Sequence, residues 1–259
     1  MAAYCAHYDS SGTAGDYLSV VVCAGVVASS EKWTKFEQRW AEVLQDFGVP
    51  YFHAREFVAS RGPFKSWRGD QQRQKKFLSA LVNVLKRGVN KGFSVTARFK
   101  DFNEVKSRYV IEKPWDIPHS FCALMCMRAV EEWIKKRKGS PGGIQHFVER
   151  GDPGQGAMAS AAEREGLSVA VQPKANRAGG HWLPGFQAAD LLAWEYRRGF
   201  VDIFMRAKSG KQLRESFGAL VTQIPHEGYE LKKNQFMALC QERPDEFPPR
   251  ELKAPTGQN

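Results

Sequence analysis

Three carboxylates in this sequence have the type and placement needed to hold a divalent metal ion: Asp9, Glu149 and Asp190. Asp9 follows the apolar stretch YCAHY, Glu149 follows IQHFV, and Asp190 lies early in FQAADLLAWEY. Converging carboxylates repel one another, and a divalent cation removes that repulsion. Mg²⁺ held by a few carboxylates keeps positions for water or phosphate oxygens, and two ions roughly 3.5–4 Å apart can cleave a phosphodiester. The three acids therefore indicate metal-dependent phosphodiester hydrolysis.

Each acid also has a structural explanation. Asp9 opens the stretch DSSG, which is typical of a turn, and Glu149 opens ERGD, which suits a surface corner. Asp190 has alanine and leucine on both sides, and an acid in an apolar helix needs a partner. Arg197, two turns further on, would supply one, so a structural ion pair stays an alternative for Asp190.

The stretch FHAREF contains a second candidate pair, His53 and Glu56. Residues three apart share one face of a helical turn, so both side chains would be able to bind a metal or hold a water molecule. The alternative is a histidine that caps a turn beneath Phe52 and Phe57.

A basic, glycine-rich stretch, KANRAGGHWLPG, comes directly before the Asp190 helix. Lys174 and Arg177 would suit phosphates, and Trp182 would stack on a base of a nucleic-acid strand. The alternative is a loop anchored by its tryptophan. The chain has 38 Lys and Arg against 28 Asp and Glu, a net charge of +10, which favours a polyanionic partner but equally fits a solvated basic surface.

Composition predicts an ordinary globular protein. The 259 residues are 42% hydrophobic and 25% charged. We expect one domain over 1–243 and a flexible, proline-rich tail over 244–259. The five cysteines form no CxxC pair, which favours reduced, buried thiols and a cytoplasmic location. Neither a signal peptide nor a membrane-spanning apolar run is visible.

The periodicity predicts the elements that must position these residues. Strands are expected over 4–9, 17–28, 92–99, 144–152 and 167–175. Helices are expected over 29–48, 70–88, 118–138, 154–166, 184–200, 209–222 and 229–241, with an irregular link at 49–67 and an excursion at 100–117. The first two strands would form a hairpin, and the later ones alternate with helices and should be parallel. The expected fold is an α/β fold with a mixed five-stranded sheet, whose chemistry collects past the strand ends.

Five stretches occur in a recognisable order: HYDSSG, the hydrophobic second strand, FHAREF, FVERGD and FQAADLLAW. Together they resemble the domain-of-unknown-function family 3800, which is grouped with the ribonuclease H-like fold, from about residue 4 to about residue 198. The resemblance implies a ribonuclease H-like α/β domain, here with C-terminal helical additions. It also implies a metal-binding nuclease centre at Asp9, Glu149 and Asp190, with His53 and a nearby acid as accessory residues. The family usually opens with Asp-Glu-Ser-Gly, and Ser10 stands here in place of the glutamate.

The sequence thus predicts a Mg²⁺- or Mn²⁺-dependent nuclease that acts on DNA or RNA through metal-activated water. In this interpretation Asp9, Glu149 and Asp190 are the metal ligands, and His53 and Glu56 position water or the leaving group. One alternative is a nucleic-acid-binding module on the same fold that has lost catalysis, which Ser10 favours. Another is a hydrolase of a small phosphorylated molecule.

Overall fold

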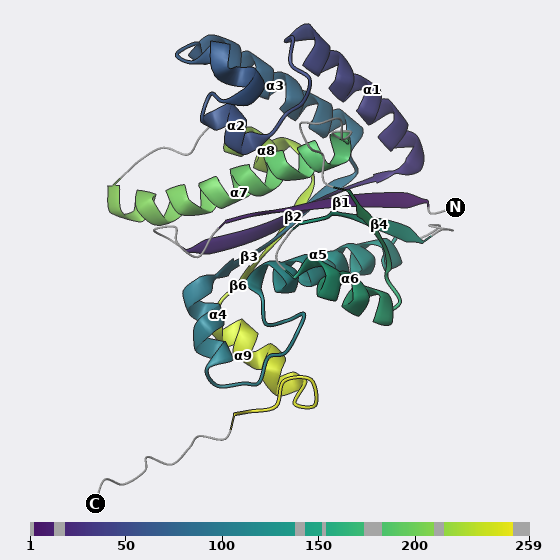
Figure 1. Cartoon of the computed structure of the whole chain (residues 1–259), viewed down its shortest axis with the longest axis vertical. Helices are drawn as coiled ribbons and strands as arrows, with labels where there is room; N and C mark the ends of the chain where they lie inside the picture. The colour runs from purple at the N-terminus through teal and green to yellow at the C-terminus, as the bar shows by residue number, and fades with distance from the viewer. Residues whose placement is uncertain are drawn as a thin grey trace, which may run out of the picture.

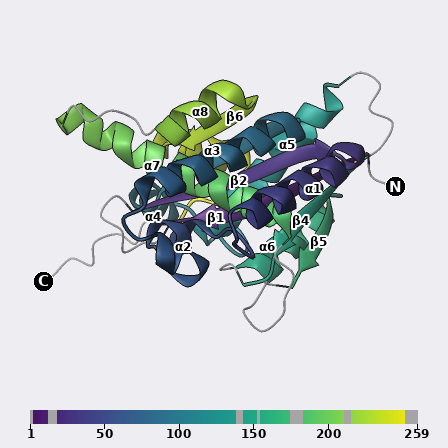
Figure 2. The same cartoon turned by 90° about the horizontal axis from the view of Figure 1, so that it is seen from above.

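A computed structural model describes residues 3–12, 19–137, 143–151, 154–173, 183–209 and 215–250, without the side chains of 204–209. Its centre is a six-stranded mixed sheet in the order β5–β4–β1–β2–β3–β6 (Figure 1, Figure 2). The strands are β1 (Tyr4–Ser11), β2 (Val20–Ser29), β3 (Lys91–Arg98), β4 (Ile144–Glu149), β5 (Ser168–Gln172) and β6 (His226–Leu231). β2 is antiparallel to β1 and β3, whereas β4, β5 and β6 join the sheet in parallel pairs.

Helices cover both faces of the sheet (Figure 1). On the α5 face lie α4 (Phe99–Lys106), α5 (Pro118–Lys135), α6 (Gln155–Arg164) and α9 (Lys233–Glu242). On the α7 face lie α1 (Ser30–Asp46), α2 (Ala54–Val58), the 3₁₀ helix η1 (Gly62–Trp67), α3 (Gln71–Gly88), α7 (Pro184–Ser209) and α8 (Glu215–Gln223). The central strand β2 is buried on both sides, which explains its continuous apolar run.

The fold class predicted from the sequence, a mixed α/β sheet flanked by helices, is confirmed, but the sheet has six strands instead of five. The additional strand, β6, starts at His226 and runs into a segment that we expected to be helical from residue 229. It is an edge strand, half-exposed along its length, with β3 as its neighbour. Its sequence HEGYEL therefore lacks the apolar alternation by which a half-buried strand is recognised.

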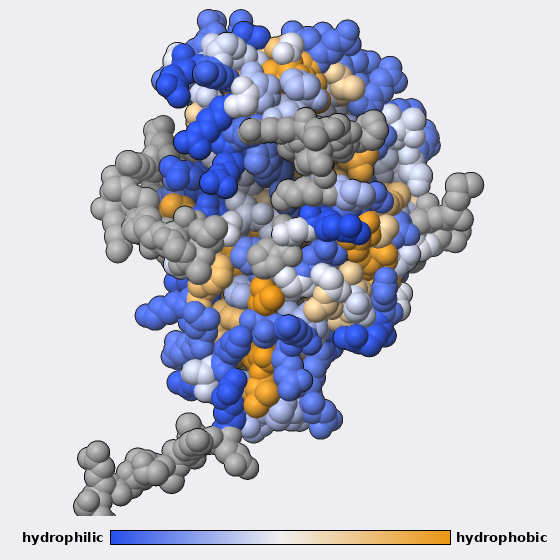
Figure 3. Space-filling model, in the orientation of Figure 1, coloured by the Kyte–Doolittle hydropathy of each residue, from blue (hydrophilic) through white to orange (hydrophobic). Residues whose placement is uncertain are grey.

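Three other segments differ from expectation. The link at 49–67 contains α2 and η1, and the excursion at 100–117 overlaps α4. Residues 244–250, expected in the flexible tail, are packed, with Phe247 buried against Trp115; residues 251–259 lie outside the described residues. No helix in the described ranges combines the length and apolar character needed to cross a membrane. Hydrophilic residues predominate on the face seen in Figure 3, with apolar ones in separate patches.

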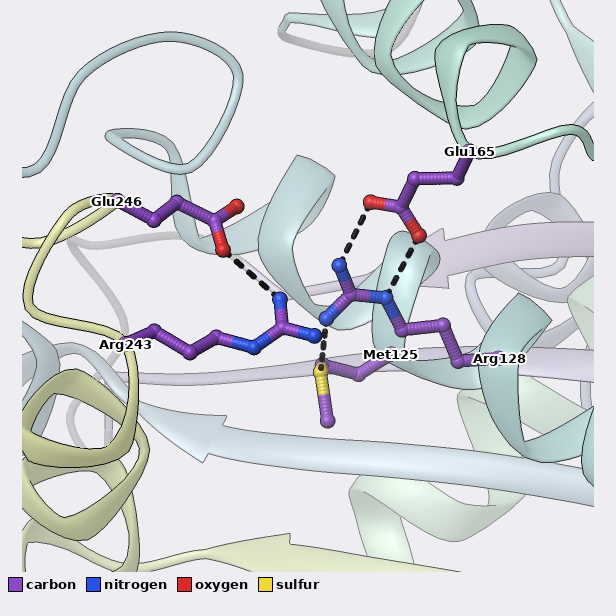
Figure 4. Close-up of polar contacts among 5 residues, drawn as sticks. All are labelled: Met125, Arg128, Glu165, Arg243 and Glu246. Carbon is purple, nitrogen blue, oxygen red and sulfur yellow. Dashed lines mark hydrogen bonds and ion pairs between the residues drawn. The ribbon is translucent and has the colours of Figure 1, made fainter.

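A bidentate ion pair between Arg128 of α5 and Glu165, at the end of α6, holds the two helices together (Figure 4). The Nε and Nη2 atoms of Arg128 donate to the two carboxylate oxygens of Glu165, at 2.8 and 2.6 Å. The guanidinium also lies 4.8 Å from the centre of the Trp115 ring. Beside it, Arg243 donates to Glu246 at 2.8 Å. The paired geometry around Arg128 orients α6, whose N-terminal end reaches the candidate site described below.

Replacing Arg128 with Met should lower the free energy of unfolding by about 1–2 kcal/mol, because a charge-assisted bidentate pair and a cation–π contact are lost. The matched control is Arg243→Met, which removes a more exposed contact to Glu246 and should cost at most about 0.5 kcal/mol. Urea denaturation of both variants measures the two losses. Equal losses would show that the bidentate contact does not hold α6.

Candidate active site

Asp9 and Glu149 lie side by side at the carboxyl ends of two neighbouring parallel strands. His7 of β1 is paired with Phe147 of β4, and their rings stack with centroids 4.9 Å apart. Asp9 and Glu149 are each two residues further along, so strand alternation returns both to the same face. This sheet edge, just past the ends of parallel strands, is where α/β proteins bind ligands.

Asp9 is part of the strand, contrary to the alternative that it belongs to a turn. It is paired with Ala24 of β2, and the β1–β2 pairing continues to Ser11 and Val22. The polar residues of DSSG remain extended because β2 runs alongside them. The backbone of Asp9 is therefore fixed by the pairing of β1 with β2, which limits the positions that its side chain can take.

The helix that carries Asp190 runs along β1 on the same face. At its start, a Cβ on Gly185 would overlap the ring of His7, so glycine allows the helix to approach the strand closely. Further on, Arg197 Nε donates to the carbonyl of Val20 at 3.2 Å. Val20 begins β2, which is antiparallel to β1. α7 therefore runs in the direction of β1.

This course brings Asp190 level with Asp9. Asp190 is five residues beyond Gly185, about 7.5 Å along the helix axis. Asp9 is two residues beyond His7, about 6.6 Å along the strand. Measured along the direction of β1, Asp190 is therefore at about the same height as Asp9 and Glu149.

Gln187 and Asp190, one helical turn apart, hold the segment that precedes α2. Gln187 Oε1 accepts the backbone N–H of Phe52 at 2.6 Å and the indole N–H of Trp40 at 3.1 Å. Asp190 Oδ2 accepts the backbone N–H of Ala54 at 2.7 Å. These contacts join the FHAREF stretch to the QAAD stretch, which lie more than a hundred residues apart in the sequence.

His53 lies between the two bonded amides and is the N-cap residue of α2, so its backbone is fixed beside Asp190. Glu56 has a different partner: its carboxylate accepts the hydroxyl of Tyr51 at 2.7 Å. The Glu56 side chain also packs closely on Gly62, whose φ is +56°. The structure thus places His53 near a predicted acid and engages Glu56 in the turn between α2 and η1.

A small pocket opens at the ends of β1 and β4 on the α5 side of the sheet, where Tyr8, Cys23 and Val148 line it. Its wall includes Asp9 and Glu149, together with His119 and Ser120 from α5 and Gln155 from α6. The last three were missed by the sequence analysis, since nothing in their spacing marks them. The one available signal was proline at the start of α5, which places the next two residues in its first turn.

His119 ties the helix to the end of β1. Its Nε2 lies 3.1 Å from the carbonyl oxygen of Gly12, and a carbonyl only accepts, so Nε2 carries the donated proton. Gly12 has φ +129°, and a Cβ there would overlap the carbonyl of Val20. The end of β1 is thus held by glycine geometry and by a side chain of the pocket.

A buried polar chain supports the two strands from the α5 face. The Tyr8 hydroxyl donates to His146 Nδ1 at 2.8 Å, and His146 Nε2 donates to Glu131 at 3.1 Å. Burial raises the pKa of Tyr8 well above its usual range, so the hydroxyl stays protonated as a donor. Tyr8, which precedes Asp9, and His146, three residues before Glu149, are therefore fixed to each other and to α5.

The donor chemistry of the acid pair suits a hard divalent cation, because Mg²⁺ and Mn²⁺ prefer carboxylate oxygens. Among the described residues, no group of three or more His, Cys, Asp and Glu side chains is already arranged to hold a metal ion. One oxygen of Asp190 accepts from Ala54. The predicted nucleic-acid contacts Lys174, Arg177 and Trp182 lie outside the described residues.

No family model and no curated protein sequence matches the chain. Among solved structures, a chain of the PCNA–RNase HII complex from Archaeoglobus fulgidus is 14% identical, with a TM-score of 0.44 and 97% of each chain covered. Ribonuclease H2 from Pyrococcus horikoshii OT3 is also 14% identical, with a TM-score of 0.40, covering 80% of this chain and 78% of that chain. Likenesses at these values carry no inference about activity, so the chemistry must follow from the residues of the site.

Replacing Gln187 with Met should lower the free energy of unfolding by about 2–6 kcal/mol, because two buried donors lose their acceptor at about 1–3 kcal/mol each. The two donors are the backbone N–H of Phe52 and the indole N–H of Trp40. Chemical denaturation followed by tryptophan fluorescence measures the change. The control is Gln38→Met on the exposed surface of α1, which should change stability by less than about 0.5 kcal/mol. Similar values for both variants would contradict the structural role of Gln187.

Proposed function

We propose that this protein is a divalent-metal-dependent nuclease of the domain-of-unknown-function family 3800, with its centre at Asp9, Glu149 and Asp190. The observation that carries the proposal is the position of Asp9 and Glu149, adjacent on one face at the carboxyl ends of parallel strands, with Asp190 level with them. This is the edge of the sheet at which a ligand has access to strand ends.

Asp9 and Glu149 would hold the cation, with Asp190 as the third carboxylate. A bound Mg²⁺ or Mn²⁺ supplies an activated water and neutralises charge on the phosphate. The β1–β4 pairing orients the first two carboxylates, and the hydrogen bond from Ala54 orients the third. His53, fixed beside Asp190, would position water or the leaving oxygen. Glu56 would act on that turn through Tyr51, as a positioning residue.

Ser10 supports a second candidate, a nucleic-acid-binding module without catalysis. It follows Asp9 on β1, is paired with Cys23 and lines the pocket where the resembling family has a carboxylate. A hydroxyl is neutral, so this chain brings one negative charge fewer to the cation than that family does. In the nuclease proposal, three carboxylates remain, and substrate phosphate supplies further oxygen ligands.

The test is cleavage of labelled single-stranded DNA, duplex DNA, RNA and RNA–DNA hybrid with Mg²⁺, Mn²⁺ or EDTA. Asp9→Asn, Glu149→Gln and Asp190→Asn should each lower the cleavage rate by about 100-fold or more, because each removes a charged ligand of the cation. Asn at position 190 keeps an oxygen that accepts from Ala54, so the fold should persist.

The matched control is Asp46→Asn, an exposed carboxylate at the end of α1 whose loss should leave the rate unchanged. Cleavage that survives EDTA, or that is equal in all variants, would contradict a metal centre at these acids. Binding without cleavage by the wild-type protein would favour the second candidate.

A further inference from the structure

A second hollow, of about 510 Å³, adjoins the small pocket that has Asp9 and Glu149 in its wall. Gln155 lines both, and Arg150, which lines the second, follows Glu149 in the chain. Lys113, from the segment between α4 and α5, also lines it. Since Arg150 follows Glu149 and α6 also lines the hollow, it lies at the end of β4, on the α5 side of the sheet edge that carries the acid pair. A strand bound at the acid pair would reach the hollow by crossing this edge.

Among the described residues, the hollow is lined by two exposed cations, Lys113 and Arg150, and one carboxylate, Asp116. In the described part of the chain, neither cation forms an ion pair. The basic surface around α9 differs, because Lys232 lies 3.6 Å from Glu230 and Lys233 is paired with Glu104. The charge of Lys113 and Arg150 is thus left for an external anion.

The backbone at the start of α6 adds to the positive electrostatic potential of the hollow. Gly154 is the N-cap with φ +75°, and no side chain caps the helix. A Cβ on Gly154 would overlap Ser120 and Ile117, so glycine lets α6 approach α5 here. The first N–H groups of a helix have no acceptor within it, and its dipole is positive at this end. They strengthen a site that the two cations define.

We propose that this hollow binds a phosphate of the nucleic-acid strand that neighbours the phosphate at the acid pair, through Lys113 and Arg150. The inference rests on the proposed function and deepens it, since it makes the substrate a strand with more than one phosphate. A single nucleotide would occupy only one of the two places, and would bind more weakly.

The experiment measures fluorescence anisotropy of a labelled single-stranded oligonucleotide, in EDTA and over a range of salt concentration, and then cleavage in Mn²⁺. The variant Lys113→Ala/Arg150→Ala should bind at least about 10-fold more weakly, and its salt dependence should have a slope smaller by about 1–2. The matched control is Lys86→Ala/Arg87→Ala, which removes the same charge from the exposed surface of α3, on the other face of the sheet (Figure 1).

Thermal denaturation should give the same midpoint for both double variants, since all four side chains are exposed. If the two double variants bind and cleave alike, the phosphate site is overturned while the nuclease proposal stands. If only Lys113→Ala/Arg150→Ala loses binding, and no protein cleaves, the phosphate site stands and the nuclease proposal fails. If the wild type neither binds nor cleaves, both fail. Competition by a mononucleotide as strong as that by the oligonucleotide would also overturn the strand site.

Discussion

Hydrogen bonds from one face of α7 to the segment before α2 are the constraint on which the candidate site depends. Gln187 and Asp190 accept the backbone N–H groups of Phe52 and Ala54, and Gln187 also accepts the indole of Trp40. Gln187 is buried, so a lost acceptor would leave buried donors unsatisfied, which is costly. The same contacts set where Asp190 stands and fix the backbone of His53 beside it. A residue of the proposed metal centre is thereby also part of the structural framework.

The other two carboxylates of the candidate site, Asp9 and Glu149, are positioned by the register of the sheet. Parallel pairing of β1 with β4 brings Asp9 and Glu149 together, although they are far apart in the sequence. Support comes from both faces: Gly185 lets α7 approach His7, and Tyr8 and His146 connect the strands to Glu131 on α5. The carboxylates are thus held by rigid elements, which suits a site that must keep a fixed geometry.

Much of this arrangement follows from sequence, because the central strand and amphipathic helices have strong periodicity. The acids at strand ends and the acid within an apolar helix were recognisable for the same reason. β6 was missed because an edge strand needs no apolar alternation, and Asp9 was assigned to a turn as one alternative because DSSG resembles one. His119 in the pocket and the Tyr51 contact of Glu56 depend on tertiary packing, which residue spacing does not reveal.

The central claim is that Asp9, Glu149 and Asp190 form one cation site, and Mn²⁺ binding tests it most directly. Calorimetric titration and thermal denaturation would compare the wild type with Asp9→Asn and Asp190→Asn, after EDTA treatment. A ligand that binds the native state raises the denaturation midpoint. We expect Mn²⁺ to bind the wild type and raise its midpoint, and to do neither for the two variants, whose metal-free folds should be intact. Mn²⁺ binding of equal strength in all three proteins would contradict the assignment of these carboxylates.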